Sequence, residues 1–325
     1  MRILITGANG FLGSHVAERL QEQGHDLRLM LRRTSNVDFL SEVQGYERVN
    51  ADLRDAASLS SVPEGVDVVV HMGGVTLART EAEYQAANGT GTANLVAAAV
   101  NAGVPRFVYV SSLAAHGPST TPQPRPLDAA GAPVTAYGRS KLSGEYAVQA
   151  HQQHLQTVIL RPPAVYGPRD KALMPLYRAG KLGIFPLLGD GMNLASFVYV
   201  DDAVDAIVRA TISETPSGAV YTFEDGEPHT WRALVGAFSR ATGRKIRVIP
   251  TPQWLYIVAG YAGGLAGAVI RKPLPLSQEK VTHISQRYWV CNSDAITRDL
   301  GWQACVGIEE GMARTLDWYK RHRWL

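Results

Sequence analysis

The chain has 325 residues, of which 46% are hydrophobic, so it can bury a large core in one or two domains. Thirty-two Lys and Arg residues oppose 29 Asp and Glu residues, and the formal charge of +3 has no basic run of the kind that nucleic-acid binding requires. Two cysteines, Cys291 and Cys305, are too few for a disulfide framework and lack metal-site spacing, which predicts a cytoplasmic protein without a bound metal.

The first half of the chain alternates short β-branched segments with longer helical patterns, which is typical of a parallel sheet covered by helices. Helices are predicted over residues 11–23 and 81–101, and a third is predicted to start near Thr135, after a proline-rich loop over residues 116–133. Strands are predicted at RILIT, DLRLML, ERVNA, DVVVHM and RFVYVSS, and we expect TVILR (157–161) and SFVYV (196–200) to extend the same sheet.

A glycine-rich turn, TGANGFLGSH, follows the first strand directly and opens the first helix. Glycines in this context let the backbone approach a diphosphate at a helix N-terminus. No Lys-Ser or Lys-Thr pair follows, so a dinucleotide is favoured over a nucleoside triphosphate, and a purely structural turn is the alternative. The expected cofactor contacts in this turn are Gly7, Asn9, Gly10, Phe11, Leu12 and Gly13.

The second strand ends in Arg32, Arg33, Thr34 and Ser35, where an acidic residue would bind the adenosine ribose hydroxyls of NAD. Two guanidiniums and two hydroxyls suit a 2′-phosphate better, so NADP(H) is favoured over NAD(H); two exposed arginines without a ligand are the alternative. Asp52 and Leu53 close the third strand and are candidates to grip the adenine, unless Asp52 is a simple loop residue.

Tyr137 and Lys141 lie four residues apart in TAYGRSK, which places them one turn apart on one helix face. A phenol with a pKa of about 10 becomes a usable acid-base group near neutral pH when an ammonium and an oxidised nicotinamide stabilise its phenolate. On this motif alone, a surface pair is the alternative. Upstream, FVYVSSL ends a strand with the hydroxyls of Ser111 and Ser112, and strand ends are where ligands bind in such sheets.

Four motifs in order, TGANGFLG, NGTGTANLVAAA, RFVYVSS and YGRSK, together resemble the extended short-chain dehydrogenase/reductase family, within the NAD-dependent epimerase/dehydratase superfamily. The resemblance implies that Ser112 orients the substrate oxygen, that Tyr137 exchanges its proton, and that Lys141 holds the nicotinamide ribose. It also implies that Asn88 is the structural asparagine and that the backbone at Val165 meets the nicotinamide. Homodimers are common in this family, so we expect this chain to form one.

The implied fold is α/β, a Rossmann doubly wound parallel sheet with a smaller, discontinuous C-terminal substrate domain. Residues 1–165, with 195–215 added, are expected to form the dinucleotide-binding domain. Residues 166–194 and 216–325 are expected to form the substrate domain.

Two features count against a nucleotide-sugar substrate. Leu113, Ala114 and Ala115 follow Ser112, where sugar dehydratases place acids, and GDGMNLASFVYVDD lacks an arginine that clamps a sugar diphosphate. Candidate substitutes for that arginine are Arg169, Lys171 and Arg178. His116 is either a wall of the substrate pocket or a structural loop histidine.

The segments 254–270 and HISQRYWVCNSDAITRDLGW resemble bacterial 3β-hydroxysteroid dehydrogenase-like and dihydroflavonol reductase-like members. We therefore expect an NAD(P)-dependent oxidoreductase that interconverts a secondary alcohol and a ketone on an apolar, steroid-like substrate, including a sterol-4-carboxylate type of reaction. The alternatives are a nucleotide-sugar epimerase or reductase and a non-catalytic cofactor-sensing module.

Residues 254–270 carry no charge, and three interpretations of this segment stay open. It is a helix that lines the substrate pocket, a helix that lies flat on the inner membrane surface with Arg271 and Lys272 at the headgroups, or a buried core helix. The membrane interpretation predicts peripheral contact through residues 254–272.

Overall fold

A parallel sheet of seven strands forms the centre of the structure, in the order β11-β6-β5-β4-β1-β2-β3. The computed structural model describes residues 1–174, 177, 183–270, 274 and 277–324. The strands of this sheet are β1 (Arg2–Thr6), β2 (Asp26–Leu31), β3 (Glu47–Asn50), β4 (Val68–His71), β5 (Arg106–Val110), β6 (Gln156–Leu160) and β11 (Ala219–Tyr221). This architecture confirms the predicted α/β doubly wound fold.

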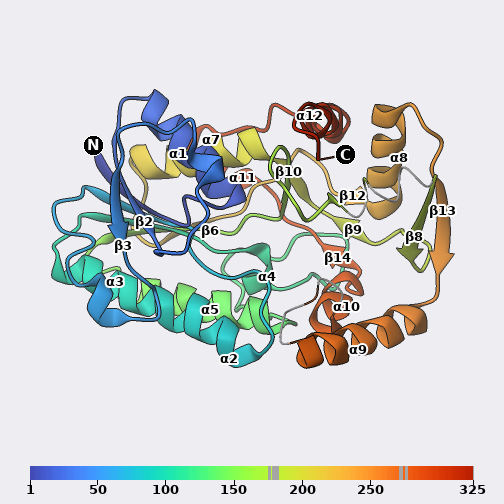
Figure 1. Cartoon of the computed structure of the whole chain (residues 1–325), viewed down its shortest axis with the longest axis horizontal. Helices are drawn as coiled ribbons and strands as arrows, with labels where there is room; N and C mark the ends of the chain where they lie inside the picture. The colour runs from blue at the N-terminus through green and yellow to red at the C-terminus, as the bar shows by residue number, and fades with distance from the viewer. Residues whose placement is uncertain (175–176, 178–182, 271–273, 275–276, 325) are drawn as a thin grey trace.

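Helices cover both faces of the sheet (Figure 1). On one face α1 (Phe11–Glu22) packs against α7 (Val200–Ile212), and on the other α3 (Gly91–Asn101) packs against α5 (Ala136–Gln149). Alternate residues of each strand point to opposite faces, so Ile3 and Ile5 enter one apolar core while Leu4 enters the other. Burial on both faces explains why these strands are almost continuously apolar.

The strand order reverses between β1 and β4, because the chain first builds outward from β1 to β3 and then returns to the other side of β1. In open parallel sheets, ligands bind in the crevice that this reversal leaves at the carboxyl ends of the strands. The glycine turn follows β1, and Ser111 and Ser112 follow β5, so both open at this edge.

The expectation that SFVYV extends the main sheet is wrong. These residues form β10 (Phe197–Tyr199), which pairs only with β7 (Ala164–Tyr166) in a separate two-stranded sheet. The seventh strand of the main sheet is instead β11, which lies inside the stretch 216–325 that was expected to belong wholly to the substrate domain. After β10 the chain continues directly into α7, and it reaches the main sheet only after that helix. There Ala219, Val220 and Tyr221 of β11 pair with β6.

The helix predicted over residues 81–101 is present with an irregularity. Its first turn is α2 (Glu81–Tyr84), its last part is α3, and between them lies a π-helical turn, η3 (Gln85–Thr90). π-turns of this kind insert one extra residue and recur at functional sites. Here the π-turn contains Asn88 and turns its side chain into the protein interior.

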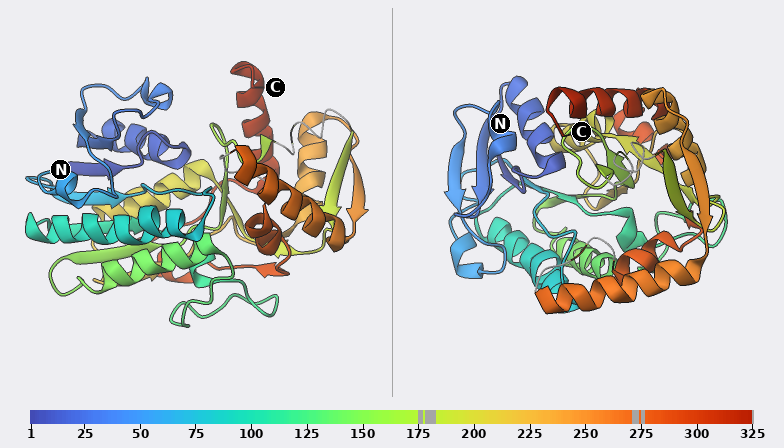
Figure 2. Two further views of the ribbon diagram at one scale, coloured as in Figure 1. Left: turned by 60° about the horizontal axis from the view of Figure 1, so that its bottom comes forward. Right: turned by 45° about the vertical axis from the view of Figure 1, so that its right-hand side comes forward.

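The smaller lobe lies beyond the carboxyl edge of the sheet (Figures 1 and 2). Its strands are β8 (Ile184–Leu188), β9 (Leu194–Ala195), β12 (His229–Thr230), β13 (Arg247–Thr251) and β14 (Tyr288–Trp289). Its helices are α8 (Trp231–Thr242), α9 (Gln253–Ile270) and α10 (Gln278–Ile284). Near the C-terminus, α12 (Ile308–Arg321) packs against α8, whereas α11 (Asp294–Leu300) packs against α7. The remaining described elements are the short helices η1 (Asp38–Leu40), η2 (Ala56–Leu59) and α4 (Leu113–His116).

Candidate active site

The glycine turn after β1 has a backbone that side chains would obstruct. Gly7 has a φ of 74°, and a Cβ there would lie 2.8 Å from the backbone nitrogen of Gly73. A Cβ on Gly13 would overlap the carbonyl oxygen of Gly7, which accepts a hydrogen bond from Gly10 N at 3.0 Å. Glycine is therefore required at both positions for the turn to close against β4 and α1.

The first helix begins without a side-chain cap. Its N-cap residue is Gly10, and no side chain accepts a hydrogen bond from the first turn, which contains Phe11, Leu12 and Gly13. Backbone N–H groups at an uncapped helix start carry partial positive charge and are suited to a phosphate oxygen. The turn and helix start therefore fit the diphosphate of a dinucleotide.

A cavity of about 480 Å³ lies between the carboxyl ends of β1, β2, β3 and β4. Gly7 and Asn9 from the glycine turn line it, and so do Asp52 and Leu53 after β3. Its other wall comes from the segment after β4, through Gly73, Gly74 and Val75. This cavity has the position and the mixed lining that an adenosine group requires.

Of the two arginines at the end of β2, only Arg32 lines this cavity, together with Ser35; Arg33 is exposed and does not line it. Asp52 is held by Arg54, whose Nη2 lies 2.6 Å from its Oδ2. This hydrogen bond lowers the pKa of Asp52 to about 2, so its carboxylate is ionised and already paired. Arg54 also lines the cavity and was not singled out in the sequence.

Ser112 and Tyr137 face each other beyond the end of β5. Burial raises the pKa of Tyr137, and a hydrogen bond with the Ser112 hydroxyl partly opposes this rise. Ser112 Oγ accepts a hydrogen bond from Ala114 N at 3.1 Å as the N-cap of α4, which orients its lone pair and leaves its proton to donate. The ring of Tyr84 packs edge-on against Tyr137, with the ring centres 6.0 Å apart.

Lys141 lies one turn beyond Tyr137 on α5 and is buried. Its Nζ donates to the carbonyl oxygen of Val110 at 2.9 Å and lies 4.3 Å from the centre of the Tyr109 ring. Burial lowers the pKa of Lys141 to about 7, and the carboxylate of Glu145 opposes this shift. The amine is therefore poised to gain or lose its proton near neutral pH.

The buried side chain of Asn88 connects the cavity wall to the catalytic helix. Its Oδ1 accepts from Val75 N at 2.8 Å, while its Nδ2 donates to Val75 O at 2.9 Å and to Ser140 Oγ at 3.0 Å. Ser140 Oγ in turn donates to the carbonyl oxygen of Tyr137 at 2.8 Å. Asn88 thus holds both the segment after β4 and the first turn of α5 in place, which suits the structural role that the resemblance implies.

Ser111 and His116 belong to a buried network behind the site. Ser111 Oγ donates to Glu145 Oε1 at 2.5 Å, and Glu145 is ion-paired with Arg161 at 2.8 Å. Arg161 Nη1 donates to His116 Nδ1 at 2.9 Å. Burial and the charge of Arg161 lower the pKa of His116 to about 4, so the imidazole is neutral and buried. Of the two interpretations of His116, the structural one fits this geometry.

The N-terminus of α5 is also bound from the smaller lobe. Glu279 on α10 accepts a hydrogen bond from Ala136 N at 2.6 Å, while Thr135 Oγ1 accepts from Gly138 N at 3.1 Å. An acceptor and a negative charge at this helix end are favourable. The contact joins residues 143 positions apart, so no local sequence signal could have identified Glu279.

Val165 lies in the middle of β7, where it pairs with Val198 of β10. It is partly exposed and follows the loop after β6, which stays beside the chain after β5 because Leu113 N donates to Pro162 O at 2.9 Å. This position is compatible with the backbone contact to nicotinamide that the resemblance implies for Val165.

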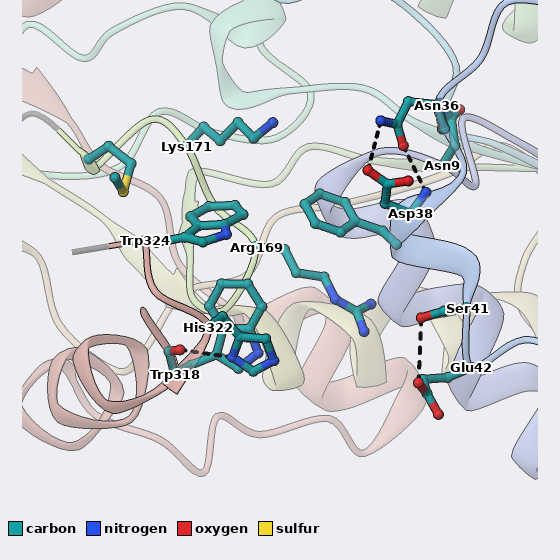
Figure 3. A pocket seen from close by; sticks show the side chains of 12 residues that line it. Asn9, Asn36, Asp38, Ser41, Glu42, Arg169, Lys171, Trp318, His322 and Trp324 are labelled. Carbon is teal, nitrogen blue, oxygen red and sulfur yellow. Dashed lines mark hydrogen bonds between the residues drawn. The ribbon is translucent and has the colours of Figure 1, made fainter. Parts of the chain in front are cut away.

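A second cavity of about 1140 Å³ opens beside Asn9, between η1 and the end of α12 (Figure 3). Phe39 and Trp324 form part of its wall, and Lys171 Nζ lies 5.8 Å and 5.7 Å from the centres of their rings. Arg169, one candidate for a diphosphate clamp, already donates hydrogen bonds within the protein, to Ser14 Oγ at 2.9 Å and to Glu18 at 2.7 Å. Arg178, the third candidate for a diphosphate clamp, lies outside the described residues.

The sequence left unassigned several residues that shape the site: Arg54, Gly73, Gly74, Val75, Ser140 and Glu279. Gly73 and Gly74, which follow β4, could have been identified from the sequence as site residues. Glycine is needed at Gly74 because a Cβ there would lie 2.6 Å from Asn88 Oδ1. Strand ends followed by glycines at the switch point of a parallel sheet are candidate cofactor contacts.

Comparison with protein-family models matches residues 3–222 to the NAD dependent epimerase/dehydratase family. Among curated proteins, the chain is 30% identical to the 2-alkyl-3-oxoalkanoate reductase of Stenotrophomonas maltophilia, over 97% of this chain and 98% of that protein. It is 29% identical to the ceramide reductase of Caulobacter vibrioides, over 99% of this chain and 96% of that protein. Both likenesses extend over the smaller lobe as well as the sheet.

Among solved structures, the chain resembles the dTDP-glucose 4,6-dehydratase of Streptomyces venezuelae with NAD bound. The TM-score is 0.82 at 24% identity, covering all of this chain and 98% of the dehydratase. At this identity the likeness concerns the fold.

Proposed function

Because the chain belongs to the NAD-dependent epimerase/dehydratase family, whose members are enzymes, we propose that it interconverts a secondary alcohol and a ketone on an apolar, lipid-like substrate. One observation carries the proposal. Ser112, the N-cap of α4, and Tyr137, in the first turn of α5, lie on helices that pack against each other at the end of β5, with the amine of Lys141 one helical turn away. This set can bind a carbonyl or hydroxyl oxygen and move one proton to or from it.

A bound nicotinamide would supply or accept the hydride at the carbinol carbon. In the reducing direction, Ser112 donates a hydrogen bond to the substrate carbonyl and Tyr137 Oη gives it a proton as the alcohol forms. In the oxidising direction, the Tyr137 phenolate accepts the hydroxyl proton. Lys141 does not contact the phenol in the structure, so we assign it to the ribose hydroxyls and to the positive potential that stabilises the phenolate.

Two features of the site and the names of two relatives favour an apolar substrate over a sugar nucleotide. Leu113 and Ala114 are buried beside Ser112, which leaves no acid there to drive an elimination. Arg169 is ion-paired with Glu18, so it is not a free clamp for a diphosphate. The two relatives named above are reductases whose substrate names describe lipids and alkyl-substituted ketones. Steroid-like alcohols, including sterol-4-carboxylates, remain within the proposed class.

We further propose NADP(H) as the preferred cofactor. Arg32 and Ser35 line the adenosine cavity, and the end of β2 carries no acidic residue that would repel a 2′-phosphate. Two acids line this cavity, and both are already ion-paired: Asp52 with Arg54, and Glu83 with Arg79.

The proposal is tested by following nicotinamide absorbance with a 2-alkyl-3-oxoalkanoate, a 3-ketosteroid and UDP-glucose, each with NADH and with NADPH. We expect cofactor oxidation with one of the ketones, and its loss by a factor of about 10³ or more in Tyr137→Phe, which still binds cofactor. Conversion of UDP-glucose without net cofactor oxidation would identify an epimerase. Cofactor binding without any turnover would identify a sensing module.

A further inference from the structure

Helix α9 (Gln253–Ile270) exposes large apolar side chains instead of burying them. Trp254, Val258 and Tyr261 are 61%, 57% and 57% exposed, and their spacing of four and three residues places them on one helix face. Leu255, Ile257 and Ile270 on the same helix are also exposed, as is Ile249 on β13. We call Ile249, Trp254, Leu255, Ile257, Val258 and Tyr261 the apolar patch. One of the three interpretations of this segment, a buried core helix, is therefore wrong.

Among the residues of α9 whose side chains the structure describes, the buried ones are glycines. Gly260 and Gly267 are buried, and a Cβ on Gly260 would lie 2.8 Å from the side chain of Val281 on α10. Tyr256 on this side donates to the carbonyl oxygen of Pro186 on β8 at 3.0 Å. Surface helices of globular proteins direct large apolar residues inward. The described part of α9 instead directs Trp254, Val258 and Tyr261 outward, while the helix contacts α10.

The stretch of sequence that carries the patch is basic. Between Glu227 and Glu279 the sequence has no acidic residue and seven basic ones, namely Arg232, Arg240, Arg244, Lys245, Arg247, Arg271 and Lys272. The net charge of the whole chain is only +3, so the remainder of the chain is net negative. Arg244, Lys245 and Arg247 are exposed on β13 and on the turn before it, and β13 leads directly into α9 (Figure 1).

We propose that the apolar patch inserts into the headgroup region of an anionic lipid bilayer, so that the enzyme binds membranes peripherally through the smaller lobe. An apolar helix face with an interfacial Trp and Tyr, in a basic surrounding, matches what such a surface attracts. A second copy of the chain fits less well, because a symmetric contact through this patch would bring two basic segments together. Among the described helices, none is long and apolar enough to cross a membrane.

The position of α9 connects this surface to the site. Helix α9 packs on α10, and Glu279 of α10 binds the N-terminus of the catalytic helix α5. Figure 2 shows α9 and α10 layered along one side of the molecule, next to α2 and α5. The proposed membrane surface thus lies on the lobe that covers the site, and an apolar substrate of the proposed function would be found in the same bilayer.

The test is cosedimentation of the purified full-length protein with vesicles of phosphatidylcholine, alone or with about 30% phosphatidylglycerol. The double variant Val258→Asp/Tyr261→Asp alters the patch, and Ile212→Asp, at an exposed apolar position on α7, is the matched control. We expect the wild type and the control to bind the anionic vesicles and the double variant to bind at least about tenfold more weakly. Added salt should weaken wild-type binding.

The proposal is overturned if the wild type stays in the supernatant with both vesicles, or if the double variant binds as well as the control. Size-exclusion chromatography tests the alternative that a second copy of the chain covers the patch. If the double variant alone elutes as a smaller species than the wild type and the control, a second copy covers the patch. Turnover of a water-soluble ketone should be equal in all three proteins. If no ketone is turned over yet vesicle binding depends on the patch, the proposed function fails and the membrane inference stands.

Discussion

At the scale of single residues, the site depends on buried side chains whose surroundings shift their pKa values. Tyr137 is packed against Tyr84, so burial raises its pKa when catalysis requires a phenolate. Lys141 is a buried amine whose only hydrogen-bond partner among the described residues is a backbone carbonyl. Such groups cost stability and are retained where their altered pKa serves a reaction.

The burial of Lys141 predicts a specific pH dependence of stability. Its pKa falls from 10.5 in the unfolded chain to about 7 in the folded protein. Between these values the unfolded chain holds the proton and the folded one does not, so this residue makes stability rise with pH from about 7 to 10.5. We expect the unfolding free energy of the wild type, minus that of Lys141→Met, to rise by up to about 1.4 kcal/mol per pH unit in this window. Urea titrations of the cofactor-free proteins at several pH values measure it, and parallel profiles would contradict the assignment.

Arg32 and Arg33 are adjacent in sequence but not equivalent in the structure, because only Arg32 lines the adenosine cavity. Arg32→Asp should therefore lower the ratio of kcat/KM for NADPH to that for NADH by about 100-fold, the size of a lost charge-assisted contact to phosphate. Arg33→Asp is the matched control and should change this ratio little. An equal effect of both substitutions would mean that general surface charge, not the cavity, sets the preference.

At the scale of elements, the catalytic helix is anchored from two directions. The side chain of Asn88, turned inward by the π-turn, reaches the first turn of α5 through Ser140. Glu279 reaches the backbone at Ala136 from α10 in the other lobe. Tyr137 lies between these anchors, so its position depends on a contact across the two lobes as well as on its own helix.

Glu279→Ala should lower kcat by about tenfold while the Kd for cofactor stays unchanged, because a freed helix start misplaces Tyr137 without altering the glycine turn. Glu279→Gln keeps an oxygen that can accept from Ala136 N and should restore most of kcat. Gln278→Ala, at an exposed neighbouring position on α10, controls for damage to the helix. Equal kcat in Glu279→Ala and the wild type would show that α10 does not position the site.

At the scale of the whole molecule, the sheet and the smaller lobe contribute different parts of the site. The sheet supplies the glycine turn, the adenosine cavity and the Ser112 and Tyr137 pair at its carboxyl edge. The smaller lobe adds Glu279 next to the pair and carries the basic stretch with the apolar patch on its outer side. The chain visits both lobes repeatedly, since β11 returns to the main sheet after β8, β9 and β10.

Much of the fold and the centre of the site follow from local patterns. Alternating strands and helices predicted the parallel sheet, since buried strands must be apolar and crossover helices amphipathic. Gly7, Gly10 and Gly13 predicted the turn, and the close approach of the backbone requires glycine at Gly7 and Gly13. Tyr137 and Lys141 share a face because a helix repeats every 3.6 residues. These features depend on neighbours within a few residues, and the sequence by itself determines them.

The remaining features depend on contacts between distant segments, which no local pattern encodes. Pairing across the sheet put three residues of β11, and not SFVYV, beside β6. The fold brought Glu279 to Ala136 and separated Arg32 from Arg33 at the cavity. An uncharged run of residues is apolar whether it faces a core or solvent, so only the tertiary structure decided that α9 turns Gly260 towards α10 and Trp254, Val258 and Tyr261 outward.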